Sequence, residues 1–331
     1  MTLKSLDFAR SRLLGSARGT PLSAPRIPEL HSEFAIAAAL AVLMAVLAIV
    51  SPAFFTPGNL RDVFVANLPV LIVATGATLV ILTGEIDISC GSMFAVCSVV
   101  AGVAAKASDS VAFAMAASLL TGAMLGATNG ALVAYAGIPS IVVTLASMVA
   151  LRDGLRWATE GTWVTDLPTS FQWLGMPATA YPALAAIIAI ITLVAGAWVL
   201  RNLGAGRAVY AVGSNRSAAR LAGLRVDVVR LGVFVAAGLL TALAALLNSV
   251  RFTQVPSNTG IGLEMKVIAA VVVGGAAITG GRGTLRGTAL GVLLLGVVGP
   301  ALTFFGSSPY WERALQGAII LTAVSAKGWK R

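Results

Sequence analysis

The chain has 331 residues, of which 58% are hydrophobic and only 11% are charged, and its mean hydropathy is +0.91. Soluble domains are about 45–50% apolar and about 25% charged, so this composition excludes a water-soluble globular enzyme. The net charge of +10 would favour a nucleic-acid partner in a soluble protein. Here the basic residues lie between apolar segments, and no basic stripe alternates with aromatic residues as a single-strand binder needs. We therefore predict a polytopic membrane protein that contacts lipid and no nucleic acid.

The chain opens with a basic tail, residues 1–33, which contains five Lys or Arg residues. The tail does not resemble a signal peptide, because the first apolar run begins only at Phe34. Ten apolar runs follow, and a helix needs about 17–25 such residues to cross the hydrocarbon core of a membrane. Gly or Pro interrupts several of them, so broken helices are expected. The predicted fold is an all-α polytopic membrane protein with about ten transmembrane helices, near 34–50, 63–83, 91–107, 111–128, 138–152, 181–200, 231–250, 266–280, 287–305 and 312–326.

The distribution of positive charge orients these spans, because cytosolic segments are enriched in Lys and Arg. With the N-terminus in the cytosol, 16 of the 23 Lys and Arg residues lie inside: five in 1–33, six in 201–230, two in 281–286 and three in 327–331. The other seven lie outside. This division favours both termini in the cytosol, a membrane-spanning domain over 34–326, and a cytosolic end at 327–331.

Two connections are longer than the others. Residues 153–180 are polar and aromatic and are predicted to lie outside, whereas residues 201–230 are strongly basic and are predicted to lie inside. Connections of this length are uncommon and often functional. Each is either a plain linker or a docking surface for another protein.

Within 201–230, the run SNRSAARLAG predicts one short helix. Ser214 or Asn215 can cap it by accepting a backbone N–H, and Gly223 can adopt the left-handed conformation that ends a helix. Alanines give the helix a smooth face that another protein could contact, although the helix could instead lie on lipid headgroups. The candidate contact residues are Asn215, Arg216, Ala218, Ala219, Arg220 and Gly223.

Two carboxylates, Glu85 and Asp87, lie between two predicted spans in the run TGEIDISCGS. Charged groups are costly within a membrane and are tolerated where a helix breaks and lines a cavity. Ser89 or Asp87 can cap the next helix, where the helix dipole favours the negative charge of Asp87; a solvated turn is the alternative. Other polar residues within spans either line a path or bond to a neighbouring helix, among them Asn67, Thr78 and Asn129.

Few residues suggest chemistry of another kind. Cys90 and Cys97 show no disulfide or metal-binding pattern, and His31 lies alone in the basic tail, so we predict no metal and no cofactor. The chain has no G-x-x-x-x-G-K-[ST] phosphate-binding loop and no H-E-x-x-H motif. We therefore expect a transport protein and not an enzyme.

At this point the sequence resembles a known family. VLIVATGATLVILTGEIDISCGS is similar to the signature G-x-T-x-V-I-L-T-G-G-I-D-L-S-V-G-S of permease subunits of ribose-type ABC importers. YAVGSNRSAARLAGLRVDVVRLGVFVAAGLLTALAALL, IGLEMKVIAAVVVGGAAITGGRGTLRGTALGVLLLGVV and SPYWERALQGAIILTAV resemble further blocks of the same family, in matching order, over about residues 50–326. Two residues depart from the family pattern: Glu85 replaces a Gly, and Arg216 replaces an acidic residue.

The resemblance implies a permease in the bacterial inner membrane that imports a monosaccharide such as ribose, xylose or rhamnose, or the furanosyl signal autoinducer-2. It implies a separate ATPase docked on 201–230, a solute-binding protein outside, placed on 153–180, and a second permease subunit, identical or different. It also makes Asn67, Thr78, Glu85, Asp87 and Asn129 candidates for the solute path. An ion-coupled secondary transporter is the rival, because broken helices suit it and Glu85 with Asp87 could hold the coupling ion.

Overall fold

The computed structural model describes residues 29–308 and 311–328. Within these residues the chain is all-helical, and an isolated bridge between Val164 and Val255 is its only β-type pairing. Two short 3₁₀ turns, η1 (Pro52–Phe55) and η2 (Gln172–Gly175), accompany the α-helices. The α-helices are α2 (Glu29–Val50), α3 (Pro57–Leu82), α4 (Cys90–Ser108), α5 (Val111–Ala134), α6 (Ser140–Ala158), α7 (Tyr181–Asn202), α8 (Gly204–Ser214), α9 (Arg216–Leu221), α10 (Val226–Ser249), α11 (Leu263–Val273), α12 (Leu285–Phe304) and α13 (Trp311–Gly328).

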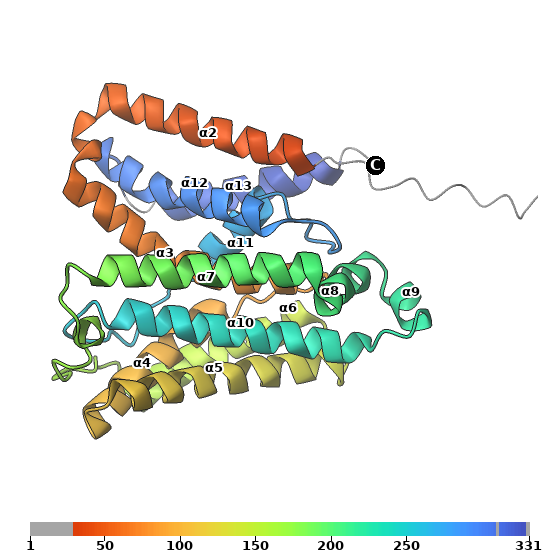
Figure 1. Cartoon of the computed structure of the whole chain (residues 1–331), viewed down its shortest axis with the longest axis horizontal. Helices are drawn as coiled ribbons and strands as arrows, with labels where there is room; N and C mark the ends of the chain where they lie inside the picture. The colour runs from red at the N-terminus through yellow and green to blue at the C-terminus, as the bar shows by residue number, and fades with distance from the viewer. Residues whose placement is uncertain (1–28, 309–310, 329–331) are drawn as a thin grey trace, which may run out of the picture.

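The long helices lie roughly parallel to one axis, and their connections gather at two ends of the molecule (Figure 1). The short helices α8 and α9 lie at one end, which we call the α9 end. The connection between α6 and α7 lies at the other, which we call the opposite end. The predicted connection 201–230 therefore contains two helices and the start of α10, and it lies at the other end of the bundle from residues 153–180.

Seven helices of the described residues are long and apolar enough to cross a membrane: α2, α3, α4, α5, α7, α10 and α12. The three other predicted spans became α6, α11 and α13, which do not meet this description. Helix α6 carries Arg152, Asp153 and Arg156, α11 has only 11 residues, and α13 begins with Glu312 and Arg313. The basic tail lies outside the described residues up to position 28, and 329–331 lie outside them as well.

The predicted span 266–280 is wrong in its second half. Helix α11 ends at Val273, and residues 274–283 form an irregular segment, which we call the glycine turn. Gly275, Gly280 and Gly281 adopt positive φ angles there, so the backbone leaves the helical conformation. The glycine turn then leads into α12, whose N-cap Thr284 accepts a hydrogen bond from the Gly287 amide at 3.0 Å.

The centre of the molecule is built by close contact between helices with small residues. Helix α10 packs against α3, α4 and α5. A Cβ atom added to Gly126 of α5 would lie 2.4 Å from the carbonyl oxygen of Phe234 on α10, so only glycine permits this approach. Packing of this kind replaces the hydrophobic effect as the force that holds helices together in lipid. It fixes α3, α4, α5 and α10 around the segment that carries Glu85 and Asp87.

Candidate functional site

The polypeptide leaves the helical conformation between α3 and α4, over residues 83–89, which we call the broken segment. Gly84 has φ of +76°, so the chain turns sharply after α3. The Leu82 carbonyl, at the end of α3, accepts a hydrogen bond from the Gly281 amide of the glycine turn at 2.9 Å. A Cβ atom on Gly213, at the end of α8, would lie 1.8 Å from the same oxygen. Three chain segments therefore meet here at backbone contact distance.

Glu85 of the broken segment is buried, with 3% of its surface exposed, and it pairs with two arginines. Its Oε1 atom accepts a hydrogen bond from Nη2 of Arg216 at 2.6 Å and from Nε of Arg230 at 2.7 Å. Arg216 is the first residue of α9, and its Nη2 also donates to the Gly84 carbonyl at 3.3 Å. Arg230 lies in α10 and is itself buried. Glu85 thus joins the broken segment to both α9 and α10.

Asp87 holds the start of α4 in place without capping it in the predicted manner. Its Oδ1 accepts from the backbone N–H of Ser89 at 2.8 Å and from the Ser89 hydroxyl at 2.6 Å. Ser89 is the N-cap residue of α4, so Asp87 bonds to the cap residue itself and not to an N–H of the first helical turn. Asp87 is 5% exposed, so the alternative of a solvated turn is wrong.

A hydrogen-bonded chain continues from Asp87 across two further helices. Nδ2 of Asn129 on α5 donates to the Ser89 hydroxyl at 2.9 Å, and the Ser147 hydroxyl of α6 donates to Oδ1 of Asn129 at 2.6 Å. The backbone of Ile86 also bonds to α6, because its N–H reaches Oγ of Ser140 and its carbonyl accepts from the Thr144 hydroxyl, both at 3.2 Å. Helix α6 therefore satisfies backbone groups that the broken helix leaves free.

Two of the predicted path residues lie elsewhere. Nδ2 of Asn67 on α3 donates to the carbonyls of Val63 and, on α12, Gly296. The hydroxyl of Thr78 pairs with that of Thr288 on α12 at 2.8 Å. Both residues therefore join α3 to α12, as the alternative interpretation of interhelical bonding expected. The structure brings Glu85, Asp87 and Asn129 together at the broken segment and places Asn67 and Thr78 outside it.

The short helix predicted in SNRSAARLAG is present as α9. Oδ1 of Asn215 accepts from the Ala218 amide at 3.0 Å, and Gly223 has φ of +83°, so the predicted cap and stop are confirmed. Ala219 is only 5% exposed, because it packs against Val212 and Val226. The prediction that Ala219 offers a contact face is therefore wrong. The outer surface of α9 carries Ala218 and Arg220, together with Leu221, which is 91% exposed.

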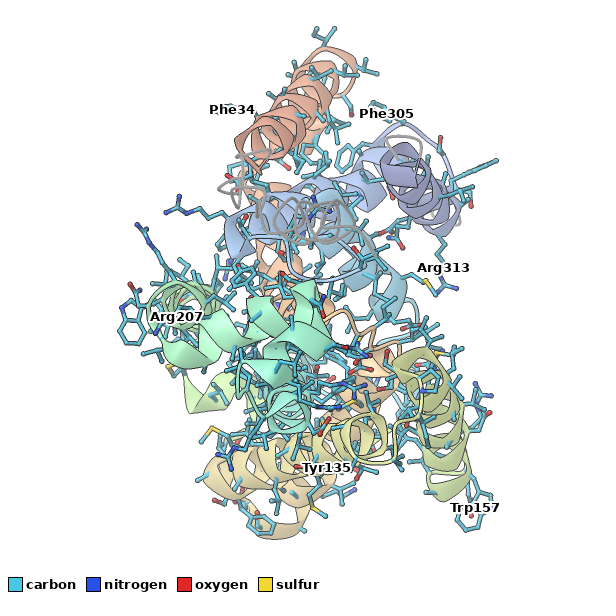
Figure 2. The ribbon with its side chains drawn as sticks, turned by 90° about the vertical axis from the view of Figure 1, so that its right-hand side faces the viewer. Phe34, Tyr135, Trp157, Arg207, Phe305 and Arg313 are labelled. Atoms are coloured by element: carbon cyan, nitrogen blue, oxygen red, sulfur yellow. The ribbon has the colours of Figure 1, made fainter. Side chains whose placement is uncertain are left out.

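One polar region was not predicted. Glu264, in the first turn of α11, pairs with Arg152 of α6 at 3.4 Å, and Lys266 pairs with Glu312 of α13 at 3.6 Å. A groove of about 410 Å³ follows α11 and α13 and is lined by Ile261, Gly262, Leu263, Lys266, Glu312, Arg313 and Gln316. Arg313 and Trp157, on α13 and α6, lie on the same side of the molecule in Figure 2. We call this side the α6–α13 face.

The polar groups of the α6–α13 face are incompletely satisfied. Glu264 is 6% exposed, and its Oε2 has no hydrogen-bond partner among the described residues; the same holds for Oε1 of Gln316. A Cβ atom on Gly91 would lie 2.1 Å from Oε2 of Glu264, so α11 begins beside the start of α4. Two features of the sequence could have indicated this polar region: the weak apolar character of 138–152 and the Glu312–Arg313 pair at the start of the last predicted span.

The opposite end is closed by residues of the connection 153–180. Val164 pairs with Val255, and the Trp173 amide donates to the Val250 carbonyl. Asp166 accepts hydrogen bonds from the Thr165 hydroxyl at 3.0 Å and from Nζ of Lys106 at 3.4 Å. These two contacts, in that order, hold the pKa of the Asp166 carboxyl below its usual value. No group of three or more His, Cys, Asp or Glu residues in the described part of the chain has the arrangement of a metal site.

Comparison with known proteins identifies the family. Residues 59–324 match the family described as the permease component of a branched-chain amino acid transport system. The chain is 35% identical over 298 residues to an autoinducer 2 import system permease protein LsrC of Enterobacter sp. strain 638, covering 90% of this chain and 87% of that protein. It is 37% identical to the Klebsiella pneumoniae LsrC over 300 residues, covering 91% and 86%. It is 35% identical to the ribose import permease protein RbsC of Escherichia coli K12 over 291 residues, covering 86% and 90%.

These matches cover the broken segment, α9 and the α6–α13 face alike. They agree with an all-helical chain that has seven apolar helices of membrane-spanning length. The protein therefore belongs to this family of transport-system permeases and is a transport subunit, not an enzyme.

Proposed function

We propose that this chain is the membrane-spanning permease subunit of an ATP-driven (ABC) importer in the bacterial cytoplasmic membrane. Its solute is a monosaccharide of the ribose, xylose or rhamnose kind, or the related signal autoinducer 2. The observation that carries the proposal is the match over nearly the whole chain to permeases named for ribose import and for autoinducer 2 import. The absence of a phosphate-binding loop from the sequence means that ATP is hydrolysed by a separate subunit.

The α9 end suits an ATPase. Helix α9 is capped at both ends, and its outer surface offers Ala218, Arg220 and Leu221 to a partner. We expect Asn215 and Gly223 to fix the shape of the helix and the exposed Arg220 to steer an acidic groove on the ATPase, which raises the association rate. Ala219 faces the helix bundle and holds α9 in place, so we do not count it among the residues that contact the ATPase.

The α6–α13 face suits a second permease subunit, identical or different. Charged side chains that face lipid are costly, and this face carries the partly exposed Arg152, Lys266 and Glu312 around the buried Glu264. A second subunit on this side would remove them from lipid and enclose the groove between the two chains. Neutral groups on the adjoining segment, Ser257, Asn258 and Thr259, are suited to the hydroxyls of a sugar. We therefore infer that solute passes along this face.

The opposite end would then face outward and receive a solute-binding protein on 153–180. This orientation keeps both termini in the cytosol and counts α6, α11 and α13 with the seven apolar helices, which gives ten crossing segments. Cysteine labelling tests it. A cysteine at Ser214 should react only from the cytosol and one at Thr165 only from outside. Both sites are exposed, whereas the native Cys90 and Cys97 are buried and give a low background.

The function is tested by reconstitution. We expect proteoliposomes with this chain, its ATPase and its binding protein to accumulate radiolabelled solute only when ATP is present. Ribose, xylose, rhamnose and autoinducer 2 should be compared under the same conditions, because the relatives include both sugar and autoinducer 2 importers. Collapse of the proton gradient should leave the rate unchanged.

Uptake by the purified chain alone, driven by an ion gradient, would instead support a secondary transporter. That rival depended on Glu85 and Asp87 as an ion site. Both carboxylates already have protein partners at 2.8 Å or less, which weakens the argument that they hold a coupling ion.

A further inference from the structure

We propose that Glu85 is a positioning residue that transmits movement of α9 to the broken segment, through one carboxylate oxygen shared by Arg216 and Arg230. The proposal rests on the proposed function, because it takes α9 as the docking helix of the ATPase. It assigns a specific task to Glu85 and Arg216. It also names the bonds through which docking at the surface reaches the interior.

The two arginines differ in how firmly they are held. The side chain of Arg230 is 10% exposed and lies in the second turn of a helix of 24 residues, so it forms the fixed arm of the cluster. The side chain of Arg216 is 45% exposed and begins a helix of six residues, so it forms the movable arm. Glu85 lies between them and is 3% exposed. A shift of α9 therefore changes one of the two bonds to the carboxylate and leaves the other in place.

The shift would then pass along the broken segment into α6. Ile86, the next residue after Glu85, bonds through its N–H and its carbonyl to Ser140 and Thr144 of α6. Asp87 reaches the same helix through Ser89, Asn129 and Ser147. Helix α6 forms one side of the α6–α13 face. A continuous series of hydrogen bonds thus joins the outer helix α9 to the face along which we infer that solute passes.

The bond between Glu85 and Arg216 joins distant parts of the chain. The side chains are 131 residues apart in sequence, yet they form an ion pair of 2.6 Å. Arg230 alone already balances the charge of the buried Glu85 carboxylate, so Arg216 adds a second hydrogen bond to Oε1 and not the neutralising charge. The bond between Glu85 and Arg216 can therefore change without leaving the buried carboxylate uncompensated.

The test measures solute moved per ATP hydrolysed, in proteoliposomes of the full complex. Glu85→Gln and Arg216→Gln should each keep ATPase association and ATP hydrolysis within about twofold of the unchanged protein while the ratio of solute to ATP falls about 10-fold, a coupling change of the usual size. The double variant should be no worse than either single variant, because the interaction can be lost only once. Arg207→Gln, at an exposed arginine of α8, is the control and should leave the ratio unchanged.

A second pair of variants relocates the charge. Glu85→Gly should lower the ratio, and Arg216→Glu should lower it further, because it places two carboxylates beside one buried arginine. The combination Glu85→Gly with Arg216→Glu returns the family residues to both positions and gives Arg230 a carboxylate from α9, so it should recover at least half of the uptake. A merely structural ion pair would not restore the ratio in this way.

The proposal is overturned if both glutamine variants assemble normally and keep the full ratio of solute to ATP. It is also overturned if they lose assembly and the relocated charge fails to restore uptake, since Glu85 would then be only a structural support. Failure of the proposed function gives a different result. In that case the unchanged complex shows no ATP-dependent uptake of any tested solute, and the purified chain shows no association with the ATPase.

Discussion

The broken segment and the α6–α13 face both place charged side chains among apolar helices, but they differ in how completely those charges are paired. At the broken segment, Oε1 of Glu85 has two arginine donors within 2.7 Å, and Asp87 has two donors within 2.8 Å. On the α6–α13 face, the ion pairs are 3.4 Å and 3.6 Å long, and Oε2 of Glu264 has no hydrogen-bond partner among the residues that the structure describes. A structural junction needs a hydrogen-bond partner for each of its buried polar atoms. A buried polar atom without such a partner can instead bind a ligand or a second subunit.

The largest effect is expected when one ion pair of the broken segment is removed. Arg230→Gln leaves buried Glu85 with only the half-exposed Arg216, and removal of one partner from a buried pair costs about 3–5 kcal/mol. We expect the free energy of unfolding in detergent to fall by about that amount, measured by thermal denaturation. The double variant Glu85→Gln with Arg230→Gln should regain much of the loss, because no buried charge then remains unpaired. A single variant as stable as the unchanged protein would contradict this account of the junction.

A smaller expected effect concerns the backbone contact beneath the same junction. A Cβ atom at Gly213 would lie 1.8 Å from the Leu82 carbonyl and 2.5 Å from the Gly281 amide, both of them backbone atoms that cannot rotate away. Gly213→Ala should therefore lower the free energy of unfolding by about 1–3 kcal/mol. Gly232→Ala in α10 is the matched control, because a Cβ atom there meets nothing within 4 Å. The control should be neutral or slightly stabilising.

The local features of these regions could be predicted from sequence, and the contacts between them could not. The cap at Asn215 and the stop at Gly223 depend on neighbouring residues, so α9 was predictable. The pairing of Glu85 with Arg216 joins residues 131 positions apart, and no local pattern indicates it. The burial of Ala219 depends in the same way on packing against α8 and α10, which the helix sequence alone does not show.

The apolar runs predicted helices correctly where the backbone stays helical throughout the run. Helices α3, α4 and α7 include most of their predicted ranges. The run 266–280 failed because its glycines count as apolar, yet two of them, Gly275 and Gly280, take positive φ angles after the helix ends at Val273. The α6–α13 face was missed for a related reason. Each charged residue was interpreted as a loop residue or as the end of a span, whereas three helices together bring the charges to one side.

The third prediction tests the incomplete pairing on the α6–α13 face. Glu264→Gln keeps the shape of a side chain whose only ion pair is 3.4 Å long, so we expect little change in the free energy of unfolding. If solute passes along this face, the loss of the charged acceptor should lower ATP-driven uptake about 10-fold, as expected for one hydrogen bond to a charged group. Asn258→Ala, on the adjoining segment, should lower uptake less. Normal uptake by both variants would place the solute path elsewhere.

The fourth prediction concerns the cap of α9. Asn215→Ala removes the bond to the Ala218 amide, and loss of a cap destabilises a helix by about 1 kcal/mol. Amide hydrogens of 216–221 should therefore exchange about fivefold faster, while those of α10 stay unchanged. Asn215→Asp keeps an acceptor in the same place and is the conservative control. Equal exchange in the alanine variant and the control would mean that packing of Ala219, and not the cap, holds α9 in place.

The smallest expected effect lies at the opposite end, where the Asp166 carboxyl is fully exposed and solvent screens its contacts. Its pKa in the folded protein is lowered, first by the Thr165 hydroxyl and then by Lys106. A group with a lowered pKa contributes stability above its unfolded-state pKa, and that contribution is lost as pH falls through the folded-state value. The contacts of the 160–170 region should therefore be unchanged between pH 7 and pH 5 and weaken only below about pH 4, the usual range of an aspartate. Hydrogen exchange of these amides measures this change, and Asp166→Asn should remove its pH dependence without altering exchange at the α9 end. If exchange at the two ends changed together with pH, the connection 153–180 and the broken segment would behave as one unit, in contrast to the separate roles proposed for them.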